Sequence, residues 1–412
     1  RLGLPAIMVS DGPHGLRRQA DEGDHLGLLA SLPATCFPSG VGLGSSWDRD
    51  MIAEVGSLIG EEAQAQGVSV VLGPACNIKR SPLCGRNFEY ISEDPYLSSQ
   101  MAKHYIQGVQ SQGVGTSIKH FCANNQESRR MTVDTIIDER TLREIYLASF
   151  ETAIREAQPA TVMCSYNKVN GTYLSDNHRL LTEILRDEWG YQGIVVSDWG
   201  AVNDRVAGVK AGMDLEMPSS GGMNDRKVVA AVRDGRLTEF DVDRVAGRVL
   251  DLVYAKLDSL KKDATFDAVA HDARARAVAS QCVVLLKNDH AALPLPKDQP
   301  VAIIGRFAEN PRYQGGGSSH INPTRLTAAL DEIRKSSPSA AYQPGSRLDT
   351  DAIDQADFNA AVAAAQTAGA AVIFAGLPDH YESEGYDRKH MHLPPNQDAL
   401  IAAVAAVCSR TL

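Results

Sequence analysis

Short apolar runs alternating with amphipathic helical stretches are the feature that most constrains this chain. Four runs rich in β-branched residues fall within the first 200 residues, at 68–72, 115–119, 161–165 and 194–197. Runs of this length, bounded by glycine and polar residues, predict buried strands. Repeated strand-then-helix units predict an α/β fold with a parallel sheet, and at this length they favour a TIM-like (β/α)8 barrel over an open sheet.

Polar side chains follow each run at its C-terminal end. The clusters are 77–86, Lys119-His120, Tyr166-Asn167 and Asp198-Trp199. Parallel strands end at one rim of a barrel, and catalytic groups collect at that rim. The sequence therefore predicts a polar site built from the loops that follow the strands.

Asp198 is the most informative residue of that set. It ends the apolar run at 194–196, and Trp199 beside it offers a flat apolar face of the kind that stacks on a sugar ring. An aspartate at this position can equally cap the next helix. The tetrapeptide alone leaves both interpretations open, and the other segments have to decide between them.

The chain is long enough for two domains, because 412 residues exceed what one hydrophobic core usually holds. We expect a barrel over residues 1–255, a linker over 256–280 and an α/β sandwich domain over 281–412. A helix at 396–407 should lead into another strand, yet the chain stops at Leu412, so we expect the second domain to be incomplete at its C-terminus. The other expected elements of this domain are strands at 282–286, 301–305 and 371–376 and a helix at 358–367.

Composition excludes several classes of partner. The formal net charge of −10 argues against a nucleic-acid partner, and no apolar run reaches the roughly 20 residues of a membrane span. The first residue is Arg1, without an initiator Met or a signal peptide, so the natural start is expected to be missing. Seven cysteines without a CxxC pair suit a reducing compartment and favour a cytoplasmic location. The sequence leaves a homo-oligomer open.

The glycine-rich segment at 315–319 resembles a phosphate-binding loop only superficially. It lacks the Gly-Lys-Ser/Thr ending of a P-loop and the GxGxxG spacing of a dinucleotide fold, so it predicts a flexible or close-approach loop. His120 has no second histidine or carboxylate at ligand spacing. We therefore expect neither a cofactor nor a metal.

Five ordered motifs, with a sixth near the C-terminus, carry a family resemblance. The first five are Ser10-Asp11-Gly12-Pro13-His14-Gly15, Gly85-Arg86-Asn87-Phe88-Glu89, Lys119-His120-Phe121, Met163-Cys164-Ser165-Tyr166-Asn167 and Val196-Ser197-Asp198-Trp199, and the sixth is Glu382-Ser383-Glu384-Gly385-Tyr386-Asp387-Arg388. Together they resemble glycoside hydrolase family 3, most closely its bacterial β-glucosidases. The resemblance implies a TIM-like barrel, an α/β sandwich and often a further fibronectin-like domain.

The same resemblance implies an activity and a role for each matching residue. The chain would be a retaining exo-β-glucosidase that releases terminal β-D-glucosyl residues from a small β-glucoside or an oligosaccharide through a covalent glycosyl-enzyme intermediate. Asp198, carried by the barrel, would be the nucleophile, and Glu384, carried by the sandwich domain, would be the general acid/base. The residues implied to hold the non-reducing sugar are Asp11, Arg86, Lys119, His120, Arg130, Met163, Tyr166 and Trp199.

Retaining hydrolysis places opposite demands on its two carboxyl groups. They lie roughly 5 to 5.5 Å apart, and one is ionised while the other carries a proton. We expect Lys119 and Arg130 to keep Asp198 ionised, and burial against Trp199 to raise the pKa of Glu384. Glu382 lies two residues upstream and would face the same side of an extended loop. The family alignment favours Glu384.

Other functions remain open at this point. Xylosidase-like relatives tend to carry Glu where this chain has Asp11, so the sequence favours glucosides. Relatives that remove N-acetylglucosamine tend to follow Lys-His-Phe with Pro-Gly, whereas Cys122 and Ala123 follow here. A non-catalytic sugar-binding descendant would be free to lose either carboxylate, and this chain has both.

Three individual residues also have structural interpretations. Arg86 could form a scaffold ion pair with Glu89 or Glu93. Met163 could pack in the core, and Tyr166 could be an interior anchor at its strand end.

Overall fold

A computed structural model describes residues 3–20, 31–297 and 299–412. The chain forms two compact units. The first comprises Arg1–Val283, Gly316–Thr324 and Glu384–Tyr386. The second comprises Val284–Gly315, Arg325–Ser383 and Asp387–Leu412. The segment that carries Glu384 therefore groups with the first unit, although the rest of the sequence near it belongs to the second.

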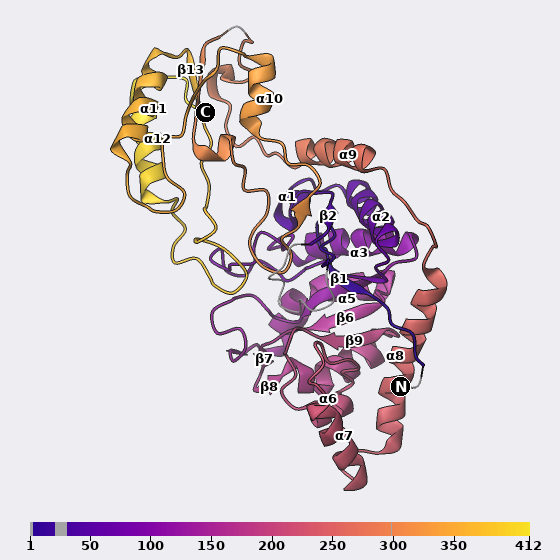
Figure 1. The fold of residues 1–412 in the computed structure, drawn as a ribbon. Coiled ribbons are helices and arrows are strands. Elements are labelled where there is room, and N and C mark those ends of the chain that lie inside the picture. Colours follow the sequence, from indigo (N-terminus) through magenta and orange to yellow (C-terminus); the bar gives the residue numbers. More distant parts are fainter. Residues whose placement is uncertain (1–2, 21–30, 298) are drawn as a thin grey trace. The chain divides into compact units, whose positions relative to one another are not determined.

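The main sheet of the first unit is parallel throughout, and its strands are neighbours in the order in which they follow one another along the chain (Figure 1). A parallel bridge from Val196 to Leu215 continues the same progression. A doubly wound sheet would reverse its order part-way, whereas a barrel progresses in one direction. The strands are β1 (Val9–Asp11), β3 (Val70–Leu72), β4 (Gly115–Phe121), β6 (Thr161–Cys164) and β9 (Ile194–Ser197).

All four strands predicted from the apolar runs are thus confirmed, with ends shifted by at most two residues. β1 was not predicted, because a three-residue strand is too short to show a periodic pattern. β3, β4, β6 and β9 are buried along their whole length, as expected for strands covered on both faces.

Helices connect these strands and cover the sheet (Figure 1). Their starts follow local rules: Asp48 caps α2 by accepting from two backbone N–H groups, and Asp94 caps α3 just before a proline. Gly56 and Gly108 allow α2 and α3 to touch, since a Cβ on Gly108 would lie 2.1 Å from the carbonyl oxygen of Ala53. The helices are α1 (Gly40–Ser45), α2 (Arg49–Ala65), α3 (Pro95–Ser111), α4 (Glu139–Thr141), α5 (Ala148–Ala157), α6 (Arg205–Ala211), α7 (Met223–Arg233), α8 (Glu239–Ser259) and α9 (Ala268–Gln281).

Shorter elements complete the first unit. Two π-helical segments lie at Leu142–Leu147 and Arg179–Glu188, and a 3-10 turn lies at Leu174–Asp176. The short strands are β2 (Pro33–Ala34), β5 (Asp134–Thr135), β7 (Lys168–Val169), β8 (Thr172–Tyr173) and β11 (Asn322–Pro323). They form a two-stranded sheet, β11–β2, and a three-stranded sheet, β5–β7–β8.

The stretch at 256–280 is largely helical. It contains the end of α8 and most of α9, which packs against α2. His271 of α9 lies between two carboxylates of α2, 2.9 Å from Glu62 and 3.2 Å from Glu61. Ala275 and Val278 of the same helix are buried in the core of the first unit.

The second unit is a three-layer α/β/α arrangement. Its parallel sheet has the order β12–β10–β13, with α11 and α12 on one side and α10 on the other (Figure 1). Alternate residues of β10 serve the two faces: Ala302 and Ile304 pack with α11 and α12, and Val301 and Ile303 pack with α10. The elements are β10 (Val301–Ile304), α10 (Ala329–Ser336), β12 (Ala341–Gln343), α11 (Gln355–Thr367), β13 (Ala370–Ile373) and α12 (Pro395–Val407), with 3-10 turns at Asp289–Ala291 and Arg306–Ala308.

One predicted strand of this region is wrong. Residues 282–286 form no strand, and Val283 and Leu286 are exposed. An apolar run becomes a strand only where another strand satisfies its backbone groups, and this run has no ladder partner among the residues that the structure describes. By contrast, the segment expected after α12 begins to pair: the backbone N–H of Leu412 donates to Ala371 of β13.

Among the described residues, no helix combines the length and the apolar character needed to cross a membrane.

Candidate active site

Asp198 extends from the C-terminal end of β9 and is buried. Its Oδ1 accepts a hydrogen bond of 2.7 Å from the backbone N–H of Trp199. Its Oδ2 has no hydrogen-bond partner among the described residues and lies 3.7 Å from Nε2 of His120. One oxygen is thus fixed in place while the other keeps its lone pairs available, which is the arrangement that a nucleophilic carboxylate requires.

His120 is held from behind by Asn77. The backbone N–H of His120 donates to Oδ1 of Asn77, and the Asn77 amide donates back to the His120 carbonyl. Burial, with Arg86 and Lys119 nearby, lowers the pKa of His120 well below its usual value. The ring is therefore neutral at pH 7, so its approach to Asp198 is not an ion pair.

Asp11 and Lys119 meet on two non-adjacent strands of the same sheet. Asp11 ends β1, and its Oδ1 accepts a hydrogen bond of 3.1 Å from Nζ of the buried Lys119 on β4. A cavity of about 290 Å³ opens beside Asp11 and Trp199. The residues that line it include Ser10, Asp11, Arg17, Leu72, Trp199 and Met217.

Glu384 lies in a cradle of donors, with both oxygens bonded. Its Oε1 accepts a hydrogen bond of 2.9 Å from Arg130 and lies 3.7 Å from a guanidinium nitrogen of Arg86. Its Oε2 accepts two hydrogen bonds from Ser318, one from the backbone N–H at 2.8 Å and one from the hydroxyl at 2.7 Å. These hydrogen bonds join residues up to 254 positions apart in the sequence.

The glycine-rich segment forms one wall of this cradle. The carbonyl of Gly316 accepts from the backbone N–H of Glu384, and a Cβ on Gly317 would lie 2.4 Å from the Glu384 side chain. Gly317 also has a φ of +116°, which side-chain-bearing residues rarely adopt. The prediction of a close-approach loop at 315–319 is confirmed.

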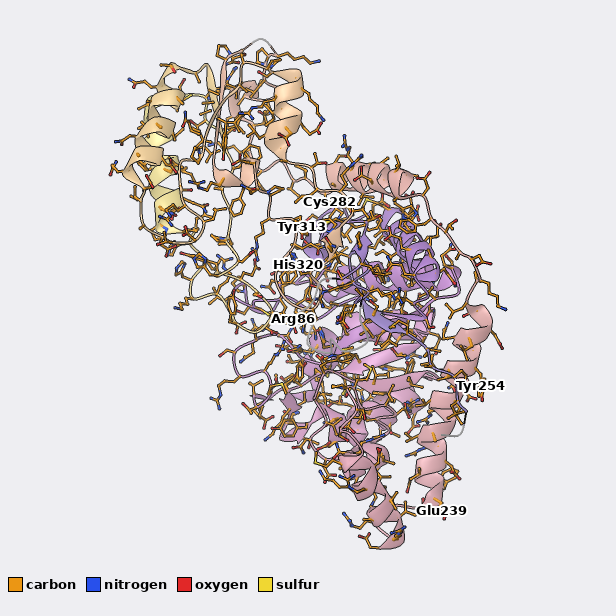
Figure 2. All side chains as sticks on the ribbon, viewed as in Figure 1. Arg86, Glu239, Tyr254, Cys282, Tyr313 and His320 are labelled. Carbon is orange, nitrogen blue, oxygen red and sulfur yellow. The ribbon has the colours of Figure 1, made fainter. Side chains whose placement is uncertain are left out.

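Arg86 connects the two sides of the site. It is fully buried in the interior of the first unit, away from Tyr254 on α8 (Figure 2). It donates a hydrogen bond of 2.8 Å to the buried Glu89, so the scaffold ion pair predicted as an alternative does form. The positive charge of the same guanidinium also favours the ionised forms of Asp198 and Glu384, so its contribution to the pKa of each is downward.

Arg130 contacts three other groups of the site. Its Nη1 donates to Glu384 and, over 2.8 Å, to the buried Glu127. Its guanidinium stacks over the Tyr166 ring at 4.7 Å from the centroid. Tyr166 is therefore an anchor for Arg130 at this strand end.

The pKa shifts of the two carboxyl groups run opposite to the predicted directions. Burial raises the pKa of Asp198, and Glu384 adds to that effect, while Arg86 and Lys119 oppose it. For Glu384, burial acts in the same upward direction, but Arg86, Arg130 and the Ser318 bonds outweigh it and hold the pKa well below its usual range. The reason is placement: Arg130 bonds to Glu384 and not to Asp198, which sequence spacing does not reveal.

Met163 lies on β6 in an apolar cluster that Trp199 borders. The cluster also contains Leu72, Val196 and Met217, so Met163 packs as a core residue beneath the indole. All ten predicted site residues lie in the first unit.

Glu382 has separate surroundings. It belongs to the second unit, where its carboxylate pairs with Arg312 at 3.1 Å. Glu384, two residues on, is the one in the arginine and serine cradle. No group of three His, Cys, Asp or Glu side chains among the described residues is arranged to hold a metal ion.

Three site residues were missed from the sequence: Glu89, Glu127 and Ser318. Glu89 was considered only as a scaffold partner, and Ser318 only as part of a loop. Glu127 gave no signal, because its significance lies in contacts with Arg130 and Gly385 that no local pattern encodes.

Comparison with known proteins assigns the chain to a family. The family model described as glycosyl hydrolase family 3 N-terminal domain matches residues 1–252, and the corresponding C-terminal domain model matches residues 283–412. The chain belongs to glycosyl hydrolase family 3. The resemblance inferred from the motifs and the predicted barrel-plus-sandwich fold class are both confirmed.

Individual family 3 relatives are closely similar. Thermostable beta-glucosidase B of Acetivibrio thermocellus is 57% identical over 99% of this chain and 55% of its own length. Exo-alpha-(1->6)-L-arabinopyranosidase of Bifidobacterium breve is 49% identical over 98% of this chain and 55% of its own length. The chain thus spans just over half the length of these relatives.

A solved structure gives the same result. The crystal structure of a Bifidobacterium adolescentis β-glucosidase superposes with a TM-score of 0.93 at 47% identity, covering 99% of this chain and 59% of that one.

Proposed function

We propose that the protein is a retaining exo-β-glucosidase in which Asp198 is the nucleophile and Glu384 the general acid/base. The observation that carries the proposal is that the buried Asp198 and the half-buried Glu384 both interact with Arg86, each in a different environment. Both act on the same guanidinium and on each other, as two groups that flank one scissile bond must. Family membership and the β-glucosidase relatives support the same activity.

In the first step, the Oδ2 of Asp198 attacks the anomeric carbon while Glu384 protonates the departing oxygen. The neighbouring Trp199 N–H holds the other oxygen of Asp198, so the attacking one is already oriented. The products of this step are a glycosyl ester on Asp198 and the free aglycone alcohol.

In the second step, ionised Glu384 removes a proton from water, which attacks the ester and releases glucose with retained configuration. The cradle favours this ionised form. The first step requires the form in which Glu384 holds the proton and Asp198 the negative charge.

The sugar subsite is proposed to use polar groups that already face one another. Asp11 and Lys119 would bind hydroxyls of the terminal glucose, with His120 and Arg86 nearer the reacting carbon. Trp199 would supply an apolar floor over the Met163 cluster. Charged donors make stronger bonds to sugar hydroxyls than neutral ones do.

A second candidate, exo-α-L-arabinopyranosidase, is favoured by the Bifidobacterium breve relative. Comparing kcat/KM on nitrophenyl β-glucoside and nitrophenyl α-L-arabinopyranoside decides between the two. A higher value on the arabinopyranoside would replace the first proposal.

The experiment that tests the acid/base assignment is leaving-group dependence in Glu384→Ala. We expect hydrolysis of methoxyphenyl glucoside to fall about 10³-fold, and hydrolysis of dinitrophenyl glucoside far less, because an acidic phenol departs without protonation. Azide, which needs no general base, should restore turnover with β-glucosyl azide as the product.

Glu382→Ala is the matched control, since this carboxylate pairs with Arg312 in the second unit. We expect only a modest loss that is equal for both substrates. The reverse pattern between the two variants would move the acid/base role to Glu382.

A further inference from the structure

Glu127 is a buried carboxylate with contacts on both sides of Glu384. It follows β4 in the sequence and is 2% exposed. Its Oε2 accepts a hydrogen bond of 2.8 Å from the backbone N–H of Gly385, the residue directly after Glu384. The same oxygen accepts from Nη1 of Arg130. Glu127 thus bonds both to the chain that carries Glu384 and to the guanidinium that binds it.

The Arg130 nitrogen is shared between two carboxylates. It lies 2.8 Å from Glu127 and 2.9 Å from Glu384. Arg86 likewise contacts two glutamates, because it bonds to the buried Glu89 and lies 3.7 Å from Glu384. Each arginine in the cradle is therefore partly neutralised by a second glutamate, and neither delivers its full charge to Glu384.

We propose that Glu127 is a positioning residue for Glu384. Glu127 anchors the backbone at Gly385, directly after Glu384, and weakens the attraction of Arg130 for the Glu384 carboxylate. This inference rests on the proposed acid/base role of Glu384. Anchoring the Gly385 backbone needs only an acceptor oxygen, whereas weakening the attraction of Arg130 for Glu384 needs a negative charge. The two parts can therefore be separated by substitution.

The effect of the Glu127 charge on the pKa of Glu384 has a definite direction. The charged and titratable groups around Glu384 are Arg86, Arg130, Glu127, Asp198 and Tyr166. Removing the negative charge of Glu127 leaves Arg130 to Glu384 alone, which stabilises the ionised form of Glu384 and lowers its pKa further. The proton needed for the first step then becomes scarcer, while the base needed for the second step remains ionised.

Glu127→Gln tests the charge part, because its amide oxygen can still accept from Gly385. We expect kcat/KM on methoxyphenyl glucoside to fall about tenfold, equivalent to about one pKa unit, and kcat/KM on dinitrophenyl glucoside to stay within about twofold of the parent. Reactivation of the 2-fluoroglucosyl enzyme at pH 7 should also stay within about twofold, since that step uses ionised Glu384.

Glu127→Ala removes the anchor as well as the charge. We expect both steps to slow, so reactivation of the 2-fluoroglucosyl enzyme should fall about tenfold or more as the base loses its position. Glu127→Asp keeps the negative charge, so it should restore much of the activity on methoxyphenyl glucoside that Glu127→Gln loses.

Glu62→Gln is the matched control for the loss of a buried glutamate. Glu62 lies on α2, where it accepts from the Thr35 backbone and contacts His271, outside the site. We expect a lower thermal midpoint without any change in leaving-group dependence.

Two results would overturn the inference. One is Glu127→Gln with parent-like rates on both substrates, and the other is an equal loss on both, which a merely structural role would produce. Failure of the proposed function is separate: it would appear as an absence of leaving-group selectivity and azide rescue in Glu384→Ala, measured in the same assay.

Discussion

The two carboxyl groups of the site differ in how the fold holds them. Asp198 is positioned by its own strand end, with one backbone hydrogen bond and one oxygen left without a partner among the described residues. Glu384 is positioned by donors from two other segments, the loop of Arg130 and the glycine-rich loop of Ser318. Local order suffices to place the proposed nucleophile at its strand tip, whereas the proposed acid/base depends on contacts between distant parts of the chain.

This difference explains their opposite pKa shifts. Burial dominates at Asp198 because few donors offset it, so its pKa rises. At Glu384 burial is outweighed by two guanidinium groups and two Ser318 bonds, so its pKa falls. Of the two carboxyl groups, Glu384, the proposed acid/base, thus accepts more of the site's hydrogen bonds.

Asp198→Ala should break the comparison most severely. We expect kcat on nitrophenyl glucoside to fall on the order of 10⁴-fold or more, because no other group can form the glycosyl ester. The thermal midpoint should be unchanged or higher, since the variant removes a buried carboxyl group that burial disfavours. Mass spectrometry of the parent after treatment with a 2-fluoro glucoside should place the label on Asp198. Near-parental kcat in the variant would refute the assignment.

Asp11 tests whether the strand-end side also decides specificity. It pairs with Lys119, so a hexose hydroxyl would complete a partly buried polar cluster that a pentose leaves unsatisfied. We expect kcat/KM on the glucoside to exceed that on the xyloside by about 100-fold or more. Asp11→Asn should reduce that ratio. A xyloside preference in the parent would contradict this prediction.

The pH profile of Glu384→Ala sharpens the electrostatic part of the comparison. Glu384 raises the pKa of Asp198, so its removal should lower that pKa and extend activity to more acidic conditions. The measurement is the acid limb of kcat/KM on dinitrophenyl glucoside, which should move down by about one pH unit. A limb that stays in place would mean that the two carboxyl groups are not coupled.

Ser318→Ala should have the smallest effect. It removes one of the two Ser318 bonds to Glu384 and leaves the backbone N–H. The lost bond stabilises the ionised carboxylate, so the pKa of Glu384 should rise and hydrolysis of methoxyphenyl glucoside should increase by up to about fivefold, the size of one hydrogen bond of about 1 kcal/mol. Ser319→Ala is the matched control, because the buried Ser319 hydroxyl has no hydrogen-bond partner among the described residues. Equal losses in both variants would point to a disturbed loop and not to the lost bond.

The sequence by itself determined four strands of the first unit and the residues at their tips. Strands at 70–72, 115–121, 161–164 and 194–197 follow from β-branched runs bounded by turns, and parallel strands necessarily end at one rim. The approach of His120 to Asp198 is a consequence of that rule, whereas Asp11, which bonds to Lys119, lies on β1, a strand that was not predicted.

Only the tertiary structure decided how Glu384 is held and which way its pKa moves. Arg130, Ser318 and Glu127 reach it from segments that no periodic pattern relates, and the shared Arg130 nitrogen exists only once those segments are folded together. The same limit explains the wrong strand at 282–286. A local apolar pattern indicates that a segment can form a strand, but the segment forms one only where another strand pairs with it. Backbone pairing and charge interactions depend on distance in space and not along the chain.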